Sequence, residues 1–362
     1  MGYLLQNGQE GGIDLLEHSL HQAIDGLNAQ VTSPLELPDT PFVPVAQEQD
    51  SLPIQELTTP IDRHWRMTSY SGLVKQGSHH SVDATVEISG FDIDSADEHD
   101  ETLLLEPERT IFTFPKGAQP GTFLHSVFEH VEFTEPATSE NNTQVLMDLL
   151  EREQLDVEWL PVLQQLVDQV MNTALDGKKL CLGSKTSEQR LVEMEFLLPL
   201  VVLDAPSLNR ITQRHDPLSA KAGNLGFSTV QGMLKGFIDL VFEHQGKYYV
   251  LDWKSNHLGD EPEAYQGGRL ESAMAEHRYD LQYQIYSLAL HRFLRSRVAN
   301  YDYEQHFGGV YYLFLRGIDG QPNHGIFHAK PSKQFLTDLD QLIDGHQPDV
   351  RATSAGQMEL DL

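Results

Sequence analysis

The chain has 362 residues, of which 40% are hydrophobic, enough for one large core or two smaller ones. No run of about 18 apolar residues is present and the first residues, MGYLLQNGQEGG, lack a basic and an apolar segment, so we expect no membrane span and no secretion signal. The net charge of −29 argues against a chain that captures nucleic acid tightly by itself. The single cysteine, Cys181, excludes an internal disulfide and a CxxC metal site, and we expect a cytoplasmic protein.

The first 108 residues are the most acidic part, with 3 basic and 20 acidic side chains. Within them, residues 32–62 have the Pro, Gln, Glu and Ser composition of a linker, and residues 79–108 resemble a solvated acidic loop. Residues 11–29 carry apolar side chains at helical spacing. These are Ile13, Leu16, Leu20, Ile24 and Leu27.

Two segments contain helix starts. Residues 65–73, WRMTSYSGL, predict a short strand or a helix start capped by serine. Residues 114–133, FPKGAQPGTFLHSVFEHVEF, begin with turn residues and predict a helix with Thr122 as its N-cap. His125 lies at the edge of the apolar stripe of this helix, and Glu129 follows one turn later. The stripe is formed by Leu124, Val127, Phe128 and Val131.

The middle of the chain predicts helices and then a long strand. Residues 143–175 indicate one or two amphipathic helices, and residues 190–201, RLVEMEFLLPLV, alternate as a strand does. Glu193 and Glu195 share one face of this strand. Residues 209–230 look irregular and could form a surface loop over a site. The opposite strand face is expected to hold Val192, Met194, Phe196 and Leu198.

A β-hairpin is predicted from residues 236–242 and 248–255, which are separated by a polar, glycine-containing segment. If the turn is the Gln-Gly pair at 245–246, His244 pairs with Lys247 and the register of the whole hairpin is fixed.

Counting outward from that turn places Asp239 directly opposite Asp252. Two facing carboxylates repel, and a hard cation such as Mg²⁺ between them would remove the repulsion. Because strand side chains alternate, Lys254 points the same way as Asp252, while Leu251 and Trp253 point the other way. The hairpin therefore indicates a metal site with a fixed positive charge beside it.

After the hairpin, residues 278–297 predict a strong helix in which Gln282 and Tyr286 lie one turn apart. Residues 308–316, GGVYYLFLR, form an apolar run typical of a strand buried on both faces. The expected apolar face of the helix consists of Leu281, Ile285, Leu288 and Phe293.

These patterns together resemble the PD-(D/E)xK nuclease superfamily, and most closely its RecB-type members. An Asp-x-Lys alone would be common by chance, whereas the full set of motifs is not. Here GMLKGFIDLVF, YYVLDWKSNHLG, PGTFLHSVFE, TSYS and the Q-x-x-x-Y of residues 282–286 all match motifs of this type. The resemblance covers about residues 65–335 and implies an α/β fold, with a restriction-endonuclease-like core in which helices flank a mixed central β-sheet.

The resemblance also implies roles for the site residues. His125, Asp239 and Asp252 would hold Mg²⁺, with the backbone carbonyl of Trp253 as an extra ligand, and one imidazole in the set would let Mn²⁺ substitute. Lys254 would orient or deprotonate the attacking water. Glu193 would bind the metal through water or orient the nucleophile, with Glu195 as the fallback. Gln282 and Tyr286 would contact DNA and brace the lysine.

Family relatives of this kind work with RecC and RecD subunits in double-strand-break repair and degradation of linear DNA. By analogy we expect RecC-like and RecD-like partners that deliver single strands from unwound duplex, which would fit the acidity of this chain. Residues 1–64 would be the end of a helicase region and a flexible linker, residues 65–347 the nuclease domain and residues 348–362 a polar tail. The chain has no GxxxxGK[ST] loop and so no motor of its own.

Three further readings remain open. The last six residues, QMELDL, begin with Gln357, end with Leu362 and resemble a sliding-clamp-binding peptide, although a tail without a partner is the simpler reading. A nuclease-like module could bind partner subunits or DNA without cutting. A stand-alone endonuclease would need a recognition domain, and none is visible. The sequence leaves open cleavage polarity, strand preference, a response to a regulatory DNA sequence, the number of metal ions and whether the chain belongs to a longer helicase-nuclease.

Overall fold

A computed structural model describes residues 65–77 and 108–346. The predictions for residues 11–29, 32–62, 79–107 and 348–362 lie outside these ranges. Among the described residues, no helix is both long and apolar enough to cross a membrane.

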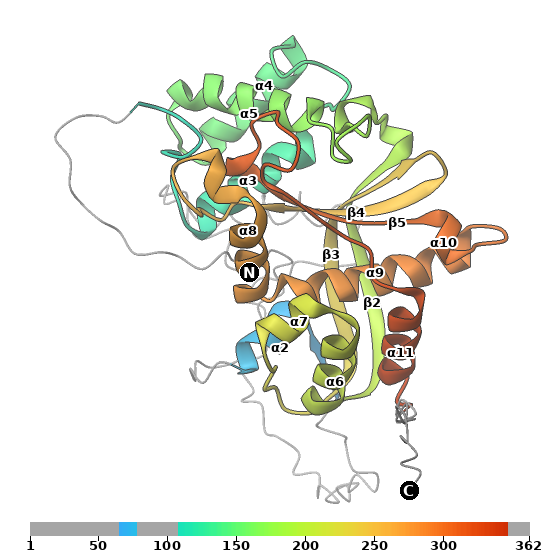
Figure 1. Cartoon of the computed structure of the whole chain (residues 1–362). Helices are drawn as coiled ribbons and strands as arrows, with labels where there is room; N and C mark the ends of the chain where they lie inside the picture. The colour runs from blue at the N-terminus through green and yellow to red at the C-terminus, as the bar shows by residue number, and fades with distance from the viewer. Residues whose placement is uncertain (1–64, 78–107, 347–362) are drawn as a thin grey trace, which may run out of the picture. The chain divides into compact units, whose positions relative to one another are not determined.

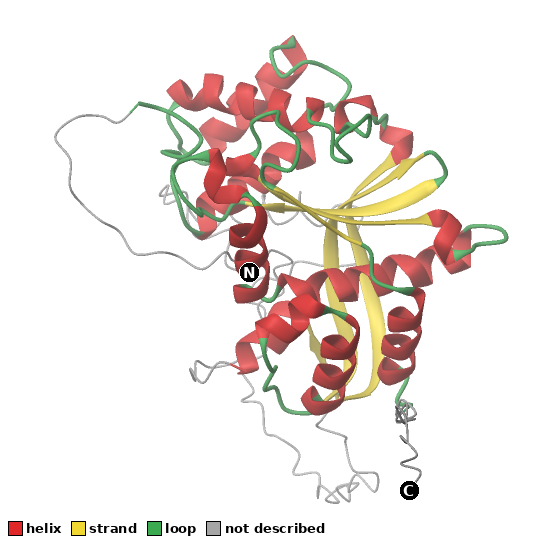
Figure 2. Ribbon diagram, viewed as in Figure 1, coloured by secondary structure: helices red, strands yellow, loops and turns green. Residues whose placement is uncertain are grey.

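A mixed six-stranded sheet forms the centre of the described part (Figures 1 and 2), as the resemblance implied. Its longest strand, β3 (Val230–His244), pairs along most of its length with antiparallel β2 (Arg190–Leu203). On its other side β3 pairs first with parallel β1 (Trp65–Thr68) and then with antiparallel β4 (Lys247–Lys254). The sheet continues through β5 (Phe307–Phe314), parallel to β4, to antiparallel β6 (Ile326–Ala329).

Helices cover the sheet in two groups (Figure 1). The first group packs with the long helix α9 (Tyr279–Arg297), and its other members are α2 (Tyr70–Gly77), α6 (Ala205–His215), α7 (Pro217–Ala222), α8 (Gly267–Glu276) and α11 (Lys333–Ile343). The second group consists of α3 (Ala118–His130), α4 (Glu140–Arg152) and α5 (Leu160–Asn172). A short helix, α10 (Tyr303–His306), precedes β5. The described part also contains short 3₁₀ turns at Val157–Trp159, Leu182–Ser184, Ser187–Gln189, Pro262–Tyr265 and Leu315–Gly317.

Each helix group encloses one hydrophobic core, so β4 and β5 are buried on both faces. In β5, Tyr312 faces the first core, built with α9, while Leu313 faces the second core, built with α3 to α5. This confirms the predicted strand buried on both faces for residues 308–314, whereas residues 315 and 316 belong to the 3₁₀ turn that follows. Of the one or two amphipathic helices expected in residues 143–175, the structure has two, α4 and α5.

The structure corrects one of the two predictions about helix starts. Thr122 is not an N-cap, because α3 begins one turn earlier after Gly117, whose φ of 109° suits glycine. The Thr122 hydroxyl instead donates to the carbonyl of Ala118 inside the helix. At the other segment the prediction holds, because the Ser69 hydroxyl accepts a hydrogen bond from the amide of Gly72 at the start of α2.

Residues 209–230 are not an irregular loop, because they contain most of α6 and all of α7. Asp204 caps α6 by accepting a hydrogen bond from the amide of Ser207, and Leu208 and Ile211 bury its inner face. The predicted apolar face of the long helix α9 is also only partly right, since Phe293 is 38% exposed.

Candidate active site

Three carboxylates lie in one row across neighbouring strands. The β3–β4 hairpin has the predicted register, with His244 paired to Lys247 and Leu240 to Leu251. The pairing ends there, and Asp239 and Asp252 are the next residues on the two strands. On the other side of β3, the pairs that flank Glu193 place it opposite Asp239. Glu193, Asp239 and Asp252 thus stand at neighbouring positions on β2, β3 and β4, next to the last residues that pair.

Strands β2 and β3 change the core that they face at this row. On β2, Val192 packs against the second core while Met194 is in the first, and on β3 Leu240 is in the second core while Ile238 is in the first. The prediction that Val192 shares a face with Met194 is therefore wrong. Between them Glu193 has a φ of 52°, a left-handed value uncommon for a residue with a side chain.

Helix α3 brings His125 to the middle of the row. Its Nδ1 lies 3.3 Å from Oδ2 of Asp239, and the same oxygen accepts a hydrogen bond of 2.8 Å from the amide of Trp253. Burial lowers the pKa of His125, but the attraction of Asp239 and Asp252 outweighs burial and raises the pKa to about 9. The Trp253 ring stacks on Phe128 of α3, with 4.5 Å between ring centroids, which fixes α3 against β4.

Glu193 lies close to other negative charges. Burial, together with the nearby charges of Asp239 and Glu129, raises the pKa of Glu193 to about 7. Glu195 has a different environment, because it is half exposed and forms an ion pair of 2.8 Å with Lys235. The structure therefore brings Glu193, and not the fallback Glu195, to the site. Glu129 was noted in the sequence only as a helical neighbour of His125.

Lys254 forms a buried ion pair with Asp252, the member of the row on β4. The Lys254 ammonium lies 2.8 Å from Oδ1 of Asp252, and both side chains are 2% exposed. The ammonium also lies 3.8 Å from the ring centroid of Tyr279 and 5.5 Å from that of Tyr312. Sequence reasoning missed these two tyrosines. The pairing of β4 with β5 places Tyr312 beside Asp252, but this register becomes visible only in the fold.

The predicted pair on α9 belongs to the same cluster. The Gln282 amide donates a 3.1 Å hydrogen bond to the Tyr286 hydroxyl, and the Gln282 carbonyl accepts a 3.0 Å hydrogen bond from the Tyr312 hydroxyl. Gln282 is 1% exposed and Tyr286 is 6% exposed. Since Tyr312 borders the lysine, this chain of hydrogen bonds can brace it.

The donor set fits a divalent cation in its chemistry. Asp239, Asp252 and Glu193 offer carboxylate oxygens, and burial makes the repulsion among these carboxylates costly. His125 offers one nitrogen. Within residues 65–77 and 108–346 no three His, Cys, Asp and Glu side chains already have the spacing of a metal centre. Instead Asp239 pairs with His125, and Asp252 pairs with Lys254.

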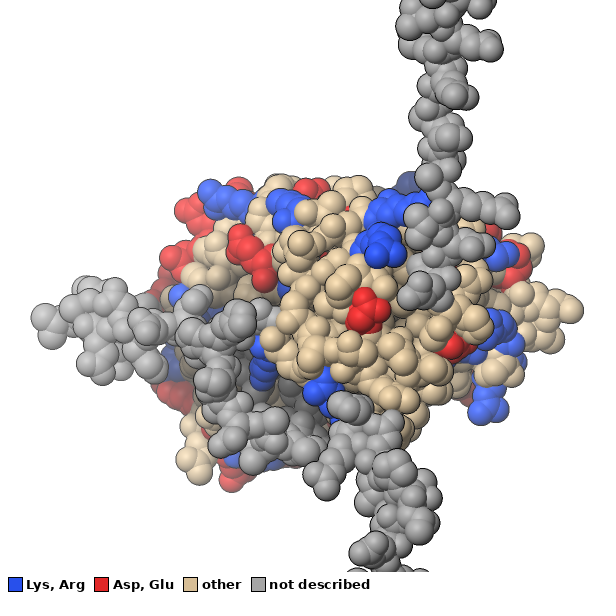
Figure 3. Space-filling view, turned by 90° about the horizontal axis from the view of Figure 1, so that it is seen from below, with Lys and Arg blue, Asp and Glu red and all other residues tan. Residues whose placement is uncertain are grey.

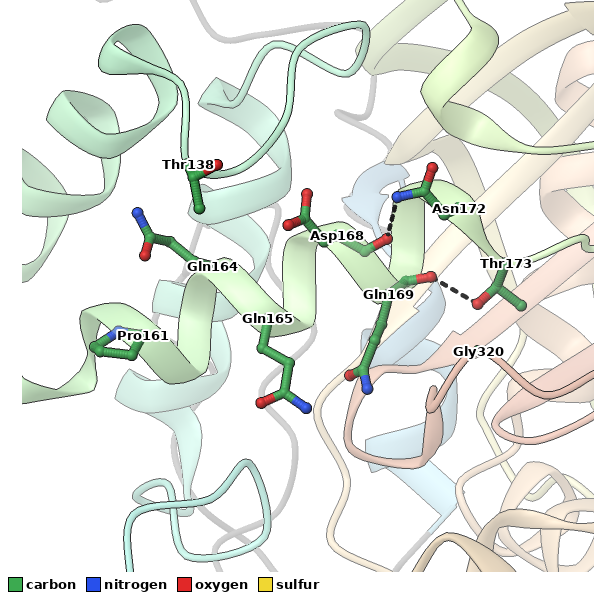
Figure 4. Close-up of a pocket in the computed structure, with 9 residues that line it drawn as sticks. All are labelled: Thr138, Pro161, Gln164, Gln165, Asp168, Gln169, Asn172, Thr173 and Gly320. Carbon is green, nitrogen blue, oxygen red and sulfur yellow. Dashed lines mark hydrogen bonds between the residues drawn. The ribbon is translucent and has the colours of Figure 1, made fainter.

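A separate pocket lies on α5, away from this row (Figure 4). Its polar lining is mostly uncharged, and its carboxylate, Asp168, accepts a hydrogen bond from the amide of Ala137. Side chains of Gln165 and Gln169 project from the helix, and Gly320 lies at the edge (Figure 4). None of the predicted site residues lines it, so it is not the candidate active site.

Comparison with known proteins supports the family resemblance that the sequence motifs indicated. The family model of the PD-(D/E)XK nuclease superfamily matches residues 102–361. The RecBCD enzyme subunit RecB of Escherichia coli (strain K12) is 44% identical over 284 residues, which cover 78% of this chain and 23% of that protein. RecB of Haemophilus influenzae is 35% identical over 326 residues, covering 86% of this chain and 26% of that protein.

RecB of Buchnera aphidicola subsp. Schizaphis graminum is 30% identical over 348 residues, covering 95% of this chain and 28% of that protein. The chain thus spans about a quarter of the length of these relatives. With the carboxylate row, the Asp-x-Lys pair and a family match over most of its length, the chain belongs to the PD-(D/E)XK nuclease superfamily.

Proposed function

We propose that this chain is a Mg²⁺-dependent deoxyribonuclease of the exodeoxyribonuclease V type, in which Mn²⁺ can substitute. The observation that carries the proposal is the set of Glu193, Asp239 and Asp252 at neighbouring positions on three adjacent strands, with Lys254 paired to Asp252. Neighbouring carboxylates that repel one another are stabilised by a divalent cation, and the adjacent ammonium suits the charge that develops on a phosphate.

The ion would be held by His125, Asp239, Asp252 and the backbone carbonyl of Trp253. When bound, it would lower the pKa of water and polarise a phosphoryl oxygen. Lys254 would orient the water and offset negative charge on the phosphate. Glu193, with its pKa raised to about 7, is suited to accept a proton near neutral pH. Gln282 and Tyr286 would hold the lysine and contact the strand.

DNA and partner subunits enter the proposal through the relatives, whose names describe them as subunits of the RecBCD enzyme. We infer that the substrate is single-stranded DNA from unwound linear duplex, and that RecC-like and RecD-like subunits deliver it during double-strand-break repair. The acidity of the chain, −29 in total, supports delivery by partners over independent capture. Clamp binding by residues 357–362 stays a prediction outside the described residues.

The test is an assay of the purified chain on linear and circular single-stranded DNA, with Mg²⁺ or with EDTA. We expect Mg²⁺-dependent cutting that falls by at least about 10³-fold in Asp239→Asn. This variant should fold, because an amide oxygen can still accept the hydrogen bond from Trp253. Asp252→Asn should be equally inactive but less stable, since it leaves the Lys254 charge buried.

The matched control is Asp260→Asn, which changes an exposed aspartate paired with His257 and should leave cutting unchanged. Folding of every variant is checked by circular dichroism. A folded Asp239→Asn protein that cuts as fast as its parent would show that the carboxylate row is not catalytic. Absence of cutting by the parent with any divalent ion would favour a binding module, and cutting of circles would demonstrate endonuclease capacity.

A further inference from the structure

Lys254 occupies a costly position for a charged side chain. Its ammonium is almost fully buried, and water therefore contributes little to its stabilisation. Two of its contacts are an ion pair of 2.8 Å with Asp252 and a position 3.8 Å from the ring centroid of Tyr279. A cation at that distance from an aromatic ring is attracted by the negative charge of the ring face.

The Tyr279 ring is itself held from several sides. Tyr279 begins α9, and its hydroxyl donates a 3.2 Å hydrogen bond to Oδ1 of Asn256, two residues after Lys254. Its ring stacks on His277 with 5.3 Å between centroids and contacts the ring of Tyr312 at 5.9 Å. The ring therefore offers the lysine a fixed surface that is tied both to α9 and to the end of β4.

We propose that Tyr279 is a positioning residue that holds the Lys254 ammonium at Asp252 through a cation–π contact. Its effect on rate rests on the proposed nuclease chemistry, whereas the contact itself exists without it. Lysine has a flexible stem and a compact charge, so one ion pair does not fix its direction. The ring closes the side of the ammonium that faces α9.

The contact matters more if Asp252 also serves a divalent cation. A carboxylate that shares its charge with a divalent cation attracts a neighbouring ammonium less strongly, and the cation itself repels the ammonium. The face of Tyr279 keeps its attraction in that situation because its charge distribution does not depend on the ion. Tyr279 would thus keep Lys254 in place when the ion pair alone could not.

Tyr283 provides a matched control one turn along the same helix. It is also buried and also contacts Tyr312, but its hydroxyl donates to Asp216 and its ring stacks near Phe327. Replacing either tyrosine should therefore loosen α9 in general, whereas only replacing Tyr279 should remove the contact with Lys254.

The rate experiment uses the full chain on single-stranded DNA with Mg²⁺. We expect Tyr279→Leu to lower kcat by about 30-fold, the equivalent of a desolvated cation–π contact, with KM changed by less than about 2-fold. Tyr279→Phe keeps the ring and should restore kcat to within about 3-fold of the parent. Tyr283→Leu should leave kcat within about 3-fold. Equal losses in the Tyr279→Leu and Tyr283→Leu variants, or no rescue by Tyr279→Phe, would overturn the proposal.

A second experiment needs neither metal nor activity. Unfolding in urea with EDTA is measured for the parent, Tyr279→Leu, Lys254→Met and the double variant, with Tyr279→Met replacing Tyr279→Leu if the latter does not fold. We expect Tyr279→Leu to raise the unfolding equilibrium constant about 30-fold more when Lys254 is present than when it is methionine. Additive effects would refute the contact, even if the chain proved to be no nuclease.

Discussion

At the scale of single residues, Glu193 combines two features that lower stability. It combines a left-handed backbone conformation with a buried carboxyl group that faces Asp239. Strain and unfavourable charge are expected where a fold keeps residues for chemistry. The resemblance pointed to Glu193, but nothing in an alternating strand pattern distinguished its environment from that of Glu195.

Glu193→Gln should stabilise the metal-free protein at pH 8 by about 1 kcal/mol, because it removes a charge that burial and Asp239 oppose. The pKa of Glu193 is raised to about 7 from its ordinary value of 4.5, so the charge costs nothing below pH 4.5, costs more as the pH rises and costs most above pH 7. Urea unfolding in EDTA at pH 8 and near pH 5 should show the gain shrinking at the lower pH. Glu195→Gln, at an exposed ion pair, is the control, and an equal gain there would contradict this explanation.

At the scale of elements, the site depends on holding α3 against β4. Arg316, 2% exposed on the 3₁₀ turn after β5, donates to the carbonyl of Ser255 at the end of β4. It also donates to carbonyls in the segment before α3, namely those of Ile111, Phe114 and Pro115. One buried guanidinium therefore ties together the two elements that carry His125 and Asp252.

Arg316→Ala should destabilise the protein by about 3–5 kcal/mol, since it leaves several buried carbonyls without these donors. Hydrogen exchange should speed up in α3 more than in α11, because only α3 adjoins the freed segment. Urea unfolding measures the total effect. Arg295→Ala, at a side chain 60% exposed, should change stability by less than about 0.5 kcal/mol, and a similar loss in both variants would rule out a special role for Arg316.

For the whole molecule, the distribution of charge does not favour tight DNA binding by this chain alone. On the face shown in Figure 3, Lys and Arg lie in scattered groups among Asp, Glu and uncharged residues. Residues 1–108 carry a net charge of −17 and the remainder −12, so neither part is basic overall. A sequence-independent DNA-binding protein normally presents a continuous basic surface to the phosphates.

We therefore expect the full chain to bind a single-stranded oligonucleotide weakly, with a dissociation constant above about 1 µM at 150 mM salt. The logarithm of affinity should fall with the logarithm of salt concentration with a slope shallower than about −3, because few phosphates are neutralised. Fluorescence anisotropy in EDTA measures both quantities without cutting. Tight binding with a steep slope would mean that the chain captures DNA without partners.

The sequence by itself determined the local geometry of the site. The Gln-Gly turn set the register of the hairpin, because both residues adopt the positive φ values, 53° and 78°, that a two-residue turn requires. That register extends to the pair Leu240 and Leu251, which precedes the two aspartates, and the strand period of two predicted that Lys254 lies beside Asp252. The helical spacing of Gln282 and Tyr286 likewise predicted their contact.

Only the tertiary structure decided which core each residue faces and what surrounds the lysine. Val192 and Met194 belong to different cores because β2 changes the core that it faces at Glu193, as β3 does at Asp239. This change depends on helices far away in the sequence. The contacts of Lys254 with Tyr279 and Tyr312 arise from the docking of α9 and the parallel pairing of β4 with β5. A turn fixes backbone pairing within a few residues, whereas burial and charge at the site depend on segments that meet only when the whole sheet is covered.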